Sequence, residues 1–407
     1  MLKIKPISDT EYQSFTKNQT DNNMYQSIEW VKSKNNKYEI LGLFNDNKMV
    51  GASIVTYIRA LRKFYVAYAS RGFIYDYSDI PGFAFAVKEY MNSKKNVIFF
   101  RMDPLIKLNT YDPHLVKTDY HQEKIIEDFI KVGFKHYGFN IDYTTWQFRF
   151  VHVLELCKSF NEQFNLMSKS TKKNIEKAIS FGVKTKRVDI QELDQVYKLF
   201  EESAKIKKIH NLTKSFYHNL ALNFNENAFM YLAYIDKKEC INNLTDKINA
   251  ETKDKRQLEK QLKDNSNSLK IKSKINIYEQ NIEKYMSIIK EVEKLDDYTN
   301  IGSLFAILYG NEMIALSSGM DYKYRSFCPK YSMYPALIKD AIKNGIKYAN
   351  FLGVKNIFDK NDEAYGVYDI KKGFGGYTVE YIGEFDLPIK KLGYKLYKAK
   401  ENKERKK

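Results

Sequence analysis

The stretch from about residue 241 to residue 296 constrains the fold of this chain more than any other. Its second arm places apolar residues three and four positions apart, at Ile275, Tyr278, Ile282, Tyr285, Ile289 and Val292. This is the a/d spacing of a coiled coil, and turn-forming residues from Asp264 to Ser268 separate it from a similar first arm. The pattern predicts an antiparallel helical hairpin with arms about 36 Å long. Two uses remain open: a dimerisation or spacer element, or an arm that touches a large substrate.

Composition indicates a folded protein with anionic partners. The 407 residues suffice for two domains, and 43% hydrophobic with 15% aromatic content excludes a disordered chain. Lys and Arg outnumber Asp and Glu by 67 to 50, which gives a net charge of +17. This favours nucleic acid, phospholipid headgroups or phosphorylated substrates, although a basic surface can also serve solubility alone. The basic stretch from Lys390 to Lys407 suits an anionic membrane surface or a solvated tail.

Several classes of site are not expected. Three widely spaced cysteines without a CxxC motif predict a reducing compartment and no zinc site, and the six histidines lack metal-ligand spacing. We therefore expect no metal, and we also expect no cofactor, since no phosphate loop or other familiar motif occurs. The chain has no apolar signal core and no run of about 18 apolar residues. The prediction is a cytoplasmic protein, peripheral to the inner face of the cell membrane.

Strand and helix signals alternate along two mixed α/β units of similar size. We predict strands at 38–44, 50–58, 64–69, 96–102, 145–154, 183–188, 229–235, 303–309, 313–319 and 348–352. Helices are predicted at 81–92, 125–132, 161–181, 190–206 and 334–344. The strand at 229–235 runs directly into the hairpin, so the hairpin is inserted in the second unit. The order predicts a duplicated α/β fold.

A few polar residues lie where packing alone does not require them. Asp103 follows a buried strand directly, where a carboxylate has limited solvation and can act on a proton. Arg71 and Gly72 lie at another strand end, and Lys371 is predicted beside a late strand. Lys169 to Lys173 form a basic helix start that suits phosphate or a nucleic-acid backbone. Each segment alone is also consistent with a structural role.

Together these segments carry a resemblance. They are QSxxW at 26–30, SRGFIxDY at 70–77, RxDP at 101–104, QxR at 147–149, SKSTKK at 168–173 and YIGEF at 381–385. In this order, with the hairpin at the expected place, they resemble the Fem family of peptidoglycan-bridge aminoacyltransferases (the FemA, FemB, FemX and MurM types). The likeness covers nearly the whole chain. Chain length and the pair Ile209-His210 are most similar to the MurM type.

The resemblance implies an α/β fold of tandem acyl-CoA-N-acyltransferase-like (GNAT-like) domains. The first would span 1–152, joined by the C-terminal segment 382–407, and the second 153–381, with the coiled-coil hairpin 241–296 inserted in it. The implied reaction moves serine, alanine or glycine from aminoacyl-tRNA to the stem-peptide lysine amine of a lipid-linked peptidoglycan precursor. The implied partners are these two substrates, the anionic inner membrane surface and a paralogous Fem-type protein. The charge of +17 fits two polyanionic substrates.

The same resemblance implies residue roles. Asp103 would orient the attacking amine or take its proton, and Lys371 would stabilise developing negative charge or contact the tRNA end. Lys34 would bind a phosphate or carboxylate of the precursor, and Arg71 and Tyr217 would also bind substrate. An aminoacyl ester is already activated, so alignment, proton removal and oxyanion stabilisation suffice without a covalent intermediate.

Three positions depart from the family pattern. Leu212 and Phe216 stand where the family usually has Arg and Tyr for the precursor, with Lys214 and Tyr217 as neighbouring substitutes. Ser317 aligns with a second binding Tyr. Two alternatives therefore stay open. One is a non-catalytic member that acts as a binding partner or scaffold, and the other is an acyl-CoA N-acyltransferase, although the chain lacks a pyrophosphate loop.

Overall fold

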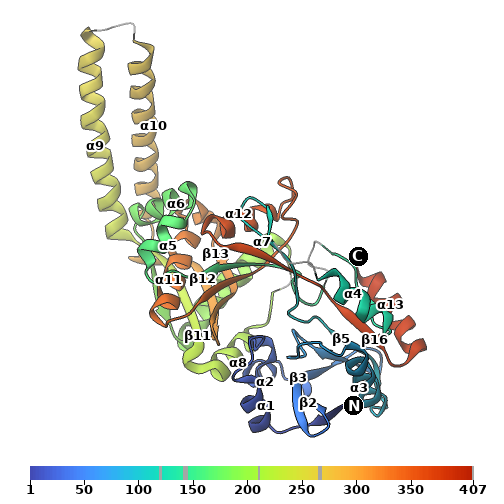
Figure 1. The fold of residues 1–407 in the computed structure, drawn as a ribbon. Helices are drawn as coiled ribbons and strands as arrows, with labels where there is room; N and C mark the ends of the chain where they lie inside the picture. Colours follow the sequence, from blue (N-terminus) through green and yellow to red (C-terminus); the bar gives the residue numbers. More distant parts are fainter. Residues whose placement is uncertain (119–121, 141–144, 210, 265–267, 406–407) are drawn as a thin grey trace.

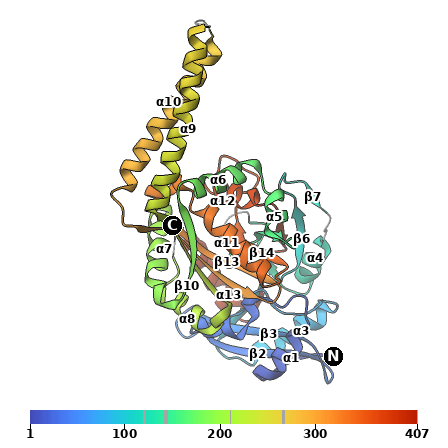
Figure 2. The same cartoon turned by 90° about the vertical axis from the view of Figure 1, so that its left-hand side faces the viewer.

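The molecule consists of two β-sheets covered by helices and one projecting helical hairpin (Figure 1). The computed structural model describes residues 1–407 except 119–121, 141–144, 210, 265–267 and 406–407. The first sheet has seven strands and the second has nine. The hairpin leaves the second sheet and points away from the first (Figures 1 and 2).

The two ends of the chain complete the first sheet together. Its strands, in spatial order, are β1 (Leu2–Pro6), β2 (Lys37–Asn45), β3 (Lys48–Arg59), β4 (Tyr65–Ala69), β5 (Val97–Met102), β16 (Phe385–Pro388) and β8 (Lys135–His136). Its helices are α1 (Asp9–Thr16), α2 (Ile28–Ser33), α3 (Ile80–Asn92), α4 (Glu123–Lys131) and α13 (Lys391–Arg405). Every residue of β5 is buried, as expected for a central strand. The C-terminal β16 pairs antiparallel with β5 and places Asp386 opposite Arg101 (Figure 1).

The second sheet carries the hairpin. Its strands, in order, are β10 (Val183–Val188), β11 (Ala228–Asp236), β12 (Tyr298–Tyr309), β13 (Glu312–Met320), β14 (Tyr348–Val354), β9 (Phe150–Glu155), β15 (Tyr377–Tyr381), β6 (Lys107–Tyr111) and β7 (Lys117–Thr118). Its helices are α5 (Phe160–Leu166), α6 (Lys169–Ser180), α7 (Leu193–Lys207), α8 (Lys214–Phe224), α11 (Lys330–Lys343) and α12 (Tyr365–Gly373). β6 and β7 precede residue 152, where the first domain was expected to end, yet both strands belong to the second sheet.

A continuous apolar core joins the two halves. Trp30 and Ile54 from the first half are buried in one cluster with Phe200, Leu220 and Phe305 from the second. Burial of such large side chains contributes about 1.5–3 kcal/mol each. The shared core therefore fixes the surfaces that face each other between the two sheets.

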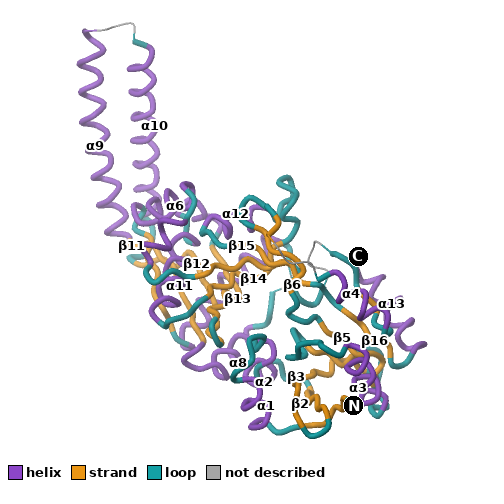
Figure 3. Tube along the Cα trace, in the orientation of Figure 1, coloured by secondary structure: helices purple, strands orange, loops and turns teal. Residues whose placement is uncertain are grey.

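The hairpin consists of α9 (Lys237–Asp264) and α10 (Leu269–Val292), which run antiparallel (Figure 3). Leu244 and Val292 at its base are fully buried, whereas Leu269 near its tip is 81% exposed. Lys255 Nζ and Glu279 Oε1 lie 2.7 Å apart and link the two helices. The predicted paired helices are thus present, and the predicted turn lies largely outside the described residues. No helix in the described part of the chain is long and apolar enough to cross a membrane.

Two predicted elements were wrong in their details. The single helix predicted at 161–181 is broken before Ser168, whose hydroxyl caps α6 by accepting a hydrogen bond from Thr171 N. The strand predicted at 145–154 begins only at Phe150. Lys371 lies in α12, and its Nζ donates to carbonyl oxygens of Leu352 and Gly353 on β14, so it does lie beside a late strand as predicted.

Candidate active site

A cavity of about 440 Å³ lies between the two halves of the molecule. Its lining includes Trp30 and Lys34 from the first half, the segment 146–148, and Tyr217 and Ser317 from the second. The structure therefore brings two of the predicted substrate-binding residues, Lys34 and Tyr217, to one cavity. Lys34 Nζ lies 4.7 Å from the centre of the Trp30 ring. Burial lowers the pKa of Lys34 to about 8, although the nearby Asp103 charge opposes this shift.

The departures from the family pattern also meet at this cavity. Leu212 and Phe216 line it, and the Phe216 ring packs edge-on against Trp30 at 5.6 Å. The hydroxyl groups of Tyr217 and Ser317 lie 2.7 Å apart in a hydrogen bond. Burial raises the pKa of Tyr217 to about 12, so its hydroxyl stays protonated near neutral pH. The positions that resemblance assigned to Arg and Tyr thus form an apolar surface beside one hydroxyl pair.

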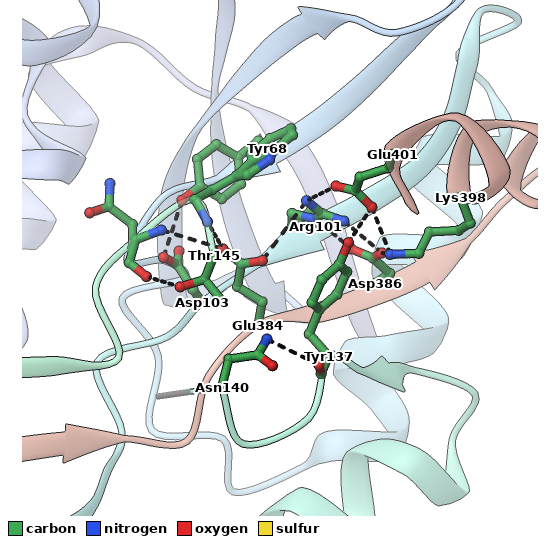
Figure 4. Close-up of polar contacts among 12 residues, drawn as sticks. Tyr68, Arg101, Asp103, Tyr137, Asn140, Thr145, Glu384, Asp386, Lys398 and Glu401 are labelled. Carbon is green, nitrogen blue, oxygen red and sulfur yellow. Dashed lines mark hydrogen bonds and ion pairs between the residues drawn. The ribbon is translucent and has the colours of Figure 1, made fainter. Parts of the chain in front are cut away.

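Asp103 is held by the residues around it. It follows β5 and is 1% exposed. Arg71 N donates to Oδ1 at 2.8 Å, and Tyr68 Oη donates to Oδ2 at 3.1 Å (Figure 4 shows the Tyr68 bond). Burial raises the pKa of Asp103 to about 6, against the opposing Arg71 charge. Among the described residues, the segment 146–148 lines the cavity and Asp103 does not.

The predicted substrate-binding residue Arg71 makes its contacts within the protein. Its side chain is 4% exposed and donates from Nη2 to the carbonyl oxygen of Phe148. The guanidinium carbon lies 4.6 Å from the centre of the Tyr381 ring. Arg71 lines a pocket of about 50 Å³ that shares Tyr25 and Leu352 with the large cavity. Its position links Asp103 to the segment 146–148.

Lys371 lies with two further lysines in a pocket of about 120 Å³. This pocket shares Lys207, Ser317 and Leu352 with the large cavity, and Lys330 also lines it. Lys371 is 8% exposed and donates from Nζ to the carbonyl oxygen of Gly353 at 2.7 Å. The three lysines, Lys207, Lys330 and Lys371, are called the lysine pocket below.

The amino groups of the lysine pocket repel one another. Burial, with added repulsion from Lys330 and Lys207, lowers the pKa of Lys371 to about 7. Burial and Lys207 lower the pKa of Lys330 to about 8. Within the described part of the chain, none of the three forms an ion pair with a carboxylate. Such a group of ammonium ions favours binding of an anion.

A second group of buried charges surrounds Arg101, two residues before Asp103 (Figure 4). Arg101 donates to both carboxylate oxygens of Asp386, at 2.6 and 2.9 Å, and to Glu401 Oε1 at 3.2 Å. Glu384 Oε2 lies 3.9 Å from Arg101 Nη1. This Arg101 cluster joins β5 to β16 and α13 and lies beside Asp103.

Other candidate chemistries have little support in the described residues. They contain no group of three His, Cys, Asp or Glu side chains that could hold a metal ion, and their three cysteines are free. Burial lowers the pKa of His152 to about 4, and this ring is hydrogen-bonded to Thr378 and to the Gly375 carbonyl. His152 therefore has a structural position within the second sheet.

The family model described as the FemAB family matches residues 7–402. The chain belongs to the FemAB family. It is similar to the aminoacyltransferases FemA and FemB of Staphylococcus epidermidis, with 26% and 27% identity. These matches cover 98% and 97% of this chain and 99% and 97% of the relatives. Family membership places this protein among the aminoacyltransferases and confirms the predicted family.

Solved structures agree on the fold. The crystal structure of FemX matches with a TM-score of 0.73 at 20% identity, covering 97% of this chain and 99% of that chain. A tandem GNAT protein from the clavulanic acid biosynthesis pathway matches with a TM-score of 0.50 at 8% identity, covering 96% and 99%. The predicted α/β fold of tandem GNAT-like domains is therefore confirmed.

Proposed function

We propose that this FemAB-family protein transfers an amino acid from aminoacyl-tRNA to the stem-peptide lysine amine of a lipid-linked peptidoglycan precursor. The observation that carries the proposal is that the large cavity and the lysine pocket adjoin and share Lys207, Ser317 and Leu352 in their linings. The cavity offers aromatic surface and Lys34 to one substrate. The pocket offers an anionic second one three lysine amino groups that have no carboxylate partner in the described part of the chain. Both substrates carry phosphate groups, which suits these lysines and the net charge of +17.

The residues supply what the reaction needs. The amine nitrogen attacks the ester carbonyl carbon, an amide bond forms, and the ester bond to the ribose oxygen breaks. On this proposal Asp103, which is 1% exposed and outside the cavity lining, reaches the amine when that lining moves, and then orients it or takes its proton. Its pKa of about 6 leaves the carboxylate ionised at neutral pH. Lys371 stabilises the negative charge on the carbonyl oxygen and donates a proton to the departing ribose oxygen. Lys34 and Tyr217 hold the precursor in the cavity.

The transferred amino acid is, on this proposal, serine or alanine in preference to glycine. The support is the likeness to the MurM type at Ile209 and His210, of which His210 lies outside the described residues. Incubation with seryl-, alanyl- and glycyl-tRNA and a lysine-containing lipid-linked precursor tests the proposal, with mass spectrometry of the precursor. A mass gain of one or more residues is expected. No gain from any of the three, while another family member modifies the same precursor, would exclude this function.

The tip of the hairpin supports contact with the tRNA body or with a paralogous partner. Lys260, Lys263, Lys270, Lys272 and Lys274 lie in the tip, with Asp264 as the single acidic residue between 260 and 274. From 237 to 252 and from 281 to 292 the charges balance. The surplus of positive charge on the hairpin is therefore concentrated at the tip, the part of the hairpin farthest from the two sheets (Figure 1). A cationic tip can bind phosphates of a large RNA.

Matched triple variants test the tip. Lys270→Gln, Lys272→Gln and Lys274→Gln together should weaken aminoacyl-tRNA binding and flatten its salt dependence. The control removes three exposed lysines near the base, Lys284, Lys290 and Lys294. If the tip variant and the base variant bind aminoacyl-tRNA with equal affinity, the hairpin does not bind tRNA through its tip and has a structural role or contacts a partner protein.

We place the reaction at the inner face of the cell membrane, where a lipid-linked substrate resides. Leu392 and Leu396 lie one turn apart on α13 and are 73% and 58% exposed, beside exposed Lys391 and Lys395. Apolar and basic side chains on one helix suit an anionic bilayer surface. Flotation with phosphatidylglycerol vesicles should recover the protein, and Leu392→Ser with Leu396→Ser should reduce the recovered fraction. Equal recovery of both forms would remove α13 from this role.

A non-catalytic role as a scaffold for active relatives is the second candidate. The observation that favours it is the apolar surface of Leu212 and Phe216, which lacks the Arg and Tyr expected there. Asp103→Asn and Lys371→Met discriminate between the two. A scaffold should restore growth of a deletion strain with either variant, whereas an enzyme should not.

An acyl-CoA N-acyltransferase is the third candidate, and the likeness to a tandem GNAT fold is its support. Calorimetric titration with acetyl-CoA tests it. Binding that is lost in the Lys371→Met variant would favour this function over aminoacyl transfer.

A further inference from the structure

Glu384 is a buried carboxylate that the proposed reaction does not use. It lies between β15 and β16 and is 1% exposed. Its Oε1 accepts hydrogen bonds from the backbone N–H groups of Trp146 and Gln147, the latter at 3.3 Å. Burial raises the pKa of Glu384 to about 7. Burying a carboxylate costs free energy unless it is hydrogen-bonded. The two bonds from backbone N–H groups offset part of this cost and link Glu384 to Trp146 and Gln147.

The segment that Glu384 holds, 146–148, lines the large cavity. It is also tied to Asp103 through two neighbours. The Trp146 ring packs edge-on against Tyr68 at 4.8 Å, and Tyr68 donates to Asp103. The carbonyl of Phe148 accepts from the side chain of Arg71, whose backbone N–H donates to Asp103.

A further contact fixes the same segment from the first half. Gln147 Nε2 donates to Ser70 Oγ at 3.0 Å. The Arg101 guanidinium lies 4.4 Å from the centre of the Trp146 ring and 3.9 Å from Glu384. Figure 4 shows Glu384 between the Arg101 cluster and the Asp103 carboxylate. A shift of Glu384 would therefore move the cavity lining and the Tyr68 bond to Asp103 together.

We propose that Glu384 is a positioning residue, whose backbone hydrogen bonds fix the segment 146–148 and thereby set the geometry of Asp103 and of the cavity. This inference rests on the proposed function, because it assigns Asp103 a place in that reaction. Glu384 acts as a hydrogen-bond acceptor in this role. Its negative charge and its proton take no part.

Two conservative variants separate the acceptor from the charge. Glu384→Gln keeps an oxygen at the same reach and removes the charge, whereas Glu384→Asp keeps the charge and shortens the reach by one methylene. We expect Glu384→Gln to stay close to wild type in kcat and in the precursor KM. Glu384→Asp should lose about 10- to 100-fold in kcat and raise the precursor KM, since a displacement of about 1 Å has that effect.

Glu401→Gln is the matched control, because it removes a carboxylate from the same Arg101 cluster without touching the segment 146–148. All variants are compared below their melting temperatures. Wild-type kinetics in Glu384→Asp overturn the inference, and so does a loss in Glu384→Gln as large as in Glu384→Asp. If Glu384→Asp does not fold, Ser70→Ala loosens Gln147 instead, and the same kinetic loss is expected; unchanged kinetics count against the inference.

Tryptophan fluorescence provides a readout that does not need activity. The chain has two tryptophans, so Trp30→Phe leaves Trp146 alone. In this background, Glu384→Asp should shift the emission to longer wavelength, and Glu384→Gln should not. If the wild-type protein transfers no amino acid, the proposed function fails, while this pair of spectra still decides whether Glu384 positions the segment. Identical spectra in both variants overturn the positioning role.

Discussion

The Arg101 cluster and Lys371 of the lysine pocket both bury charge, but in opposite ways. Arg101 is fully buried and meets the Asp386 carboxylate in a two-point ion pair. Lys371 shares its pocket with Lys330 and Lys207, and none of these has a carboxylate partner among the residues that the structure describes. A buried charge with a partner keeps its charged form, whereas one without a partner has a shifted pKa. The first group therefore stabilises the fold, and the second suits an anionic ligand.

Replacing Lys371 by methionine tests the unpaired group most directly. We expect kcat to fall by about 10²- to 10³-fold, because the developing oxyanion loses its ammonium partner. The melting temperature should stay the same or rise, because a costly buried ammonium is removed. Single-turnover transfer and thermal melting measure the two effects. Wild-type turnover, or a clearly lower melting temperature, would contradict the view that Lys371 serves an anionic ligand and not the stability of the fold.

Replacing Arg101 by methionine should have the opposite profile. The free energy of unfolding should fall by about 3–5 kcal/mol, because the buried Asp386 carboxylate loses its two-point ion pair and keeps only Lys398, at 3.9 Å, as a cationic neighbour. Urea unfolding measures this change. The control is Arg256→Met, at an exposed position on α9, which should change stability by about 0.5 kcal/mol or less. A loss no greater than that of the control would show that the Arg101 cluster is not what holds β16 in place.

The pH dependence of kcat/KM should reflect the titration of two groups, Asp103 and Lys371. Activity should rise as Asp103 loses its proton near pH 6 and fall as Lys371 loses its proton near pH 7. Lys371→Arg keeps its proton at all these pH values, so the alkaline limb should move upward while the acid limb stays. Initial rates measured from about pH 5 to about pH 9 cover both limbs, because this range spans the titration of both groups. An alkaline limb unchanged by Lys371→Arg would assign it to another group.

The smallest expected effect concerns Lys330. Lys330→Gln should raise the KM for aminoacyl-tRNA a few-fold and lower the slope of log K against log salt by about 0.7, as for one lost contact with single-stranded RNA. Lys343→Gln removes an exposed charge from the other end of the same helix, α11, and should leave both unchanged. If the precursor KM rises in place of the tRNA KM, the lysine pocket binds the phosphates of the precursor.

Local sequence patterns predicted those elements whose signal lies within a short stretch of the chain. The hairpin was predictable from the 3-4 spacing between Ile275 and Val292, and β5 from the apolar run before Asp103. The exchange of β6 and β7 into the second sheet was not, because strand pairing depends on contacts far apart in sequence. The resemblance supplied the family and the tandem fold, which the family match and the solved structures confirm. The residue roles remain predictions.

The candidate site was predicted less completely than the fold. Asp103 stood out because it follows a buried strand directly, and Lys371 because packing alone does not require a lysine at its predicted position beside a late strand. Lys207 and Lys330 were missed, since single lysines in a chain with 67 basic residues carry no local signal. Glu384 belongs to the YIGEF segment that supported the resemblance, yet nothing in the sequence assigned it a contact. Only the folded chain places it against Trp146.

The pairing of β16 with β5 has a consequence for biosynthesis. A ribosome makes Arg101 long before it makes Asp386, so the nascent first sheet lacks its partner strand until almost the whole chain has emerged. During that interval Arg101 has neither Asp386 nor Glu401 to neutralise it. The first sheet is therefore complete only after β16 has been made, and a chain truncated before residue 385 cannot close it.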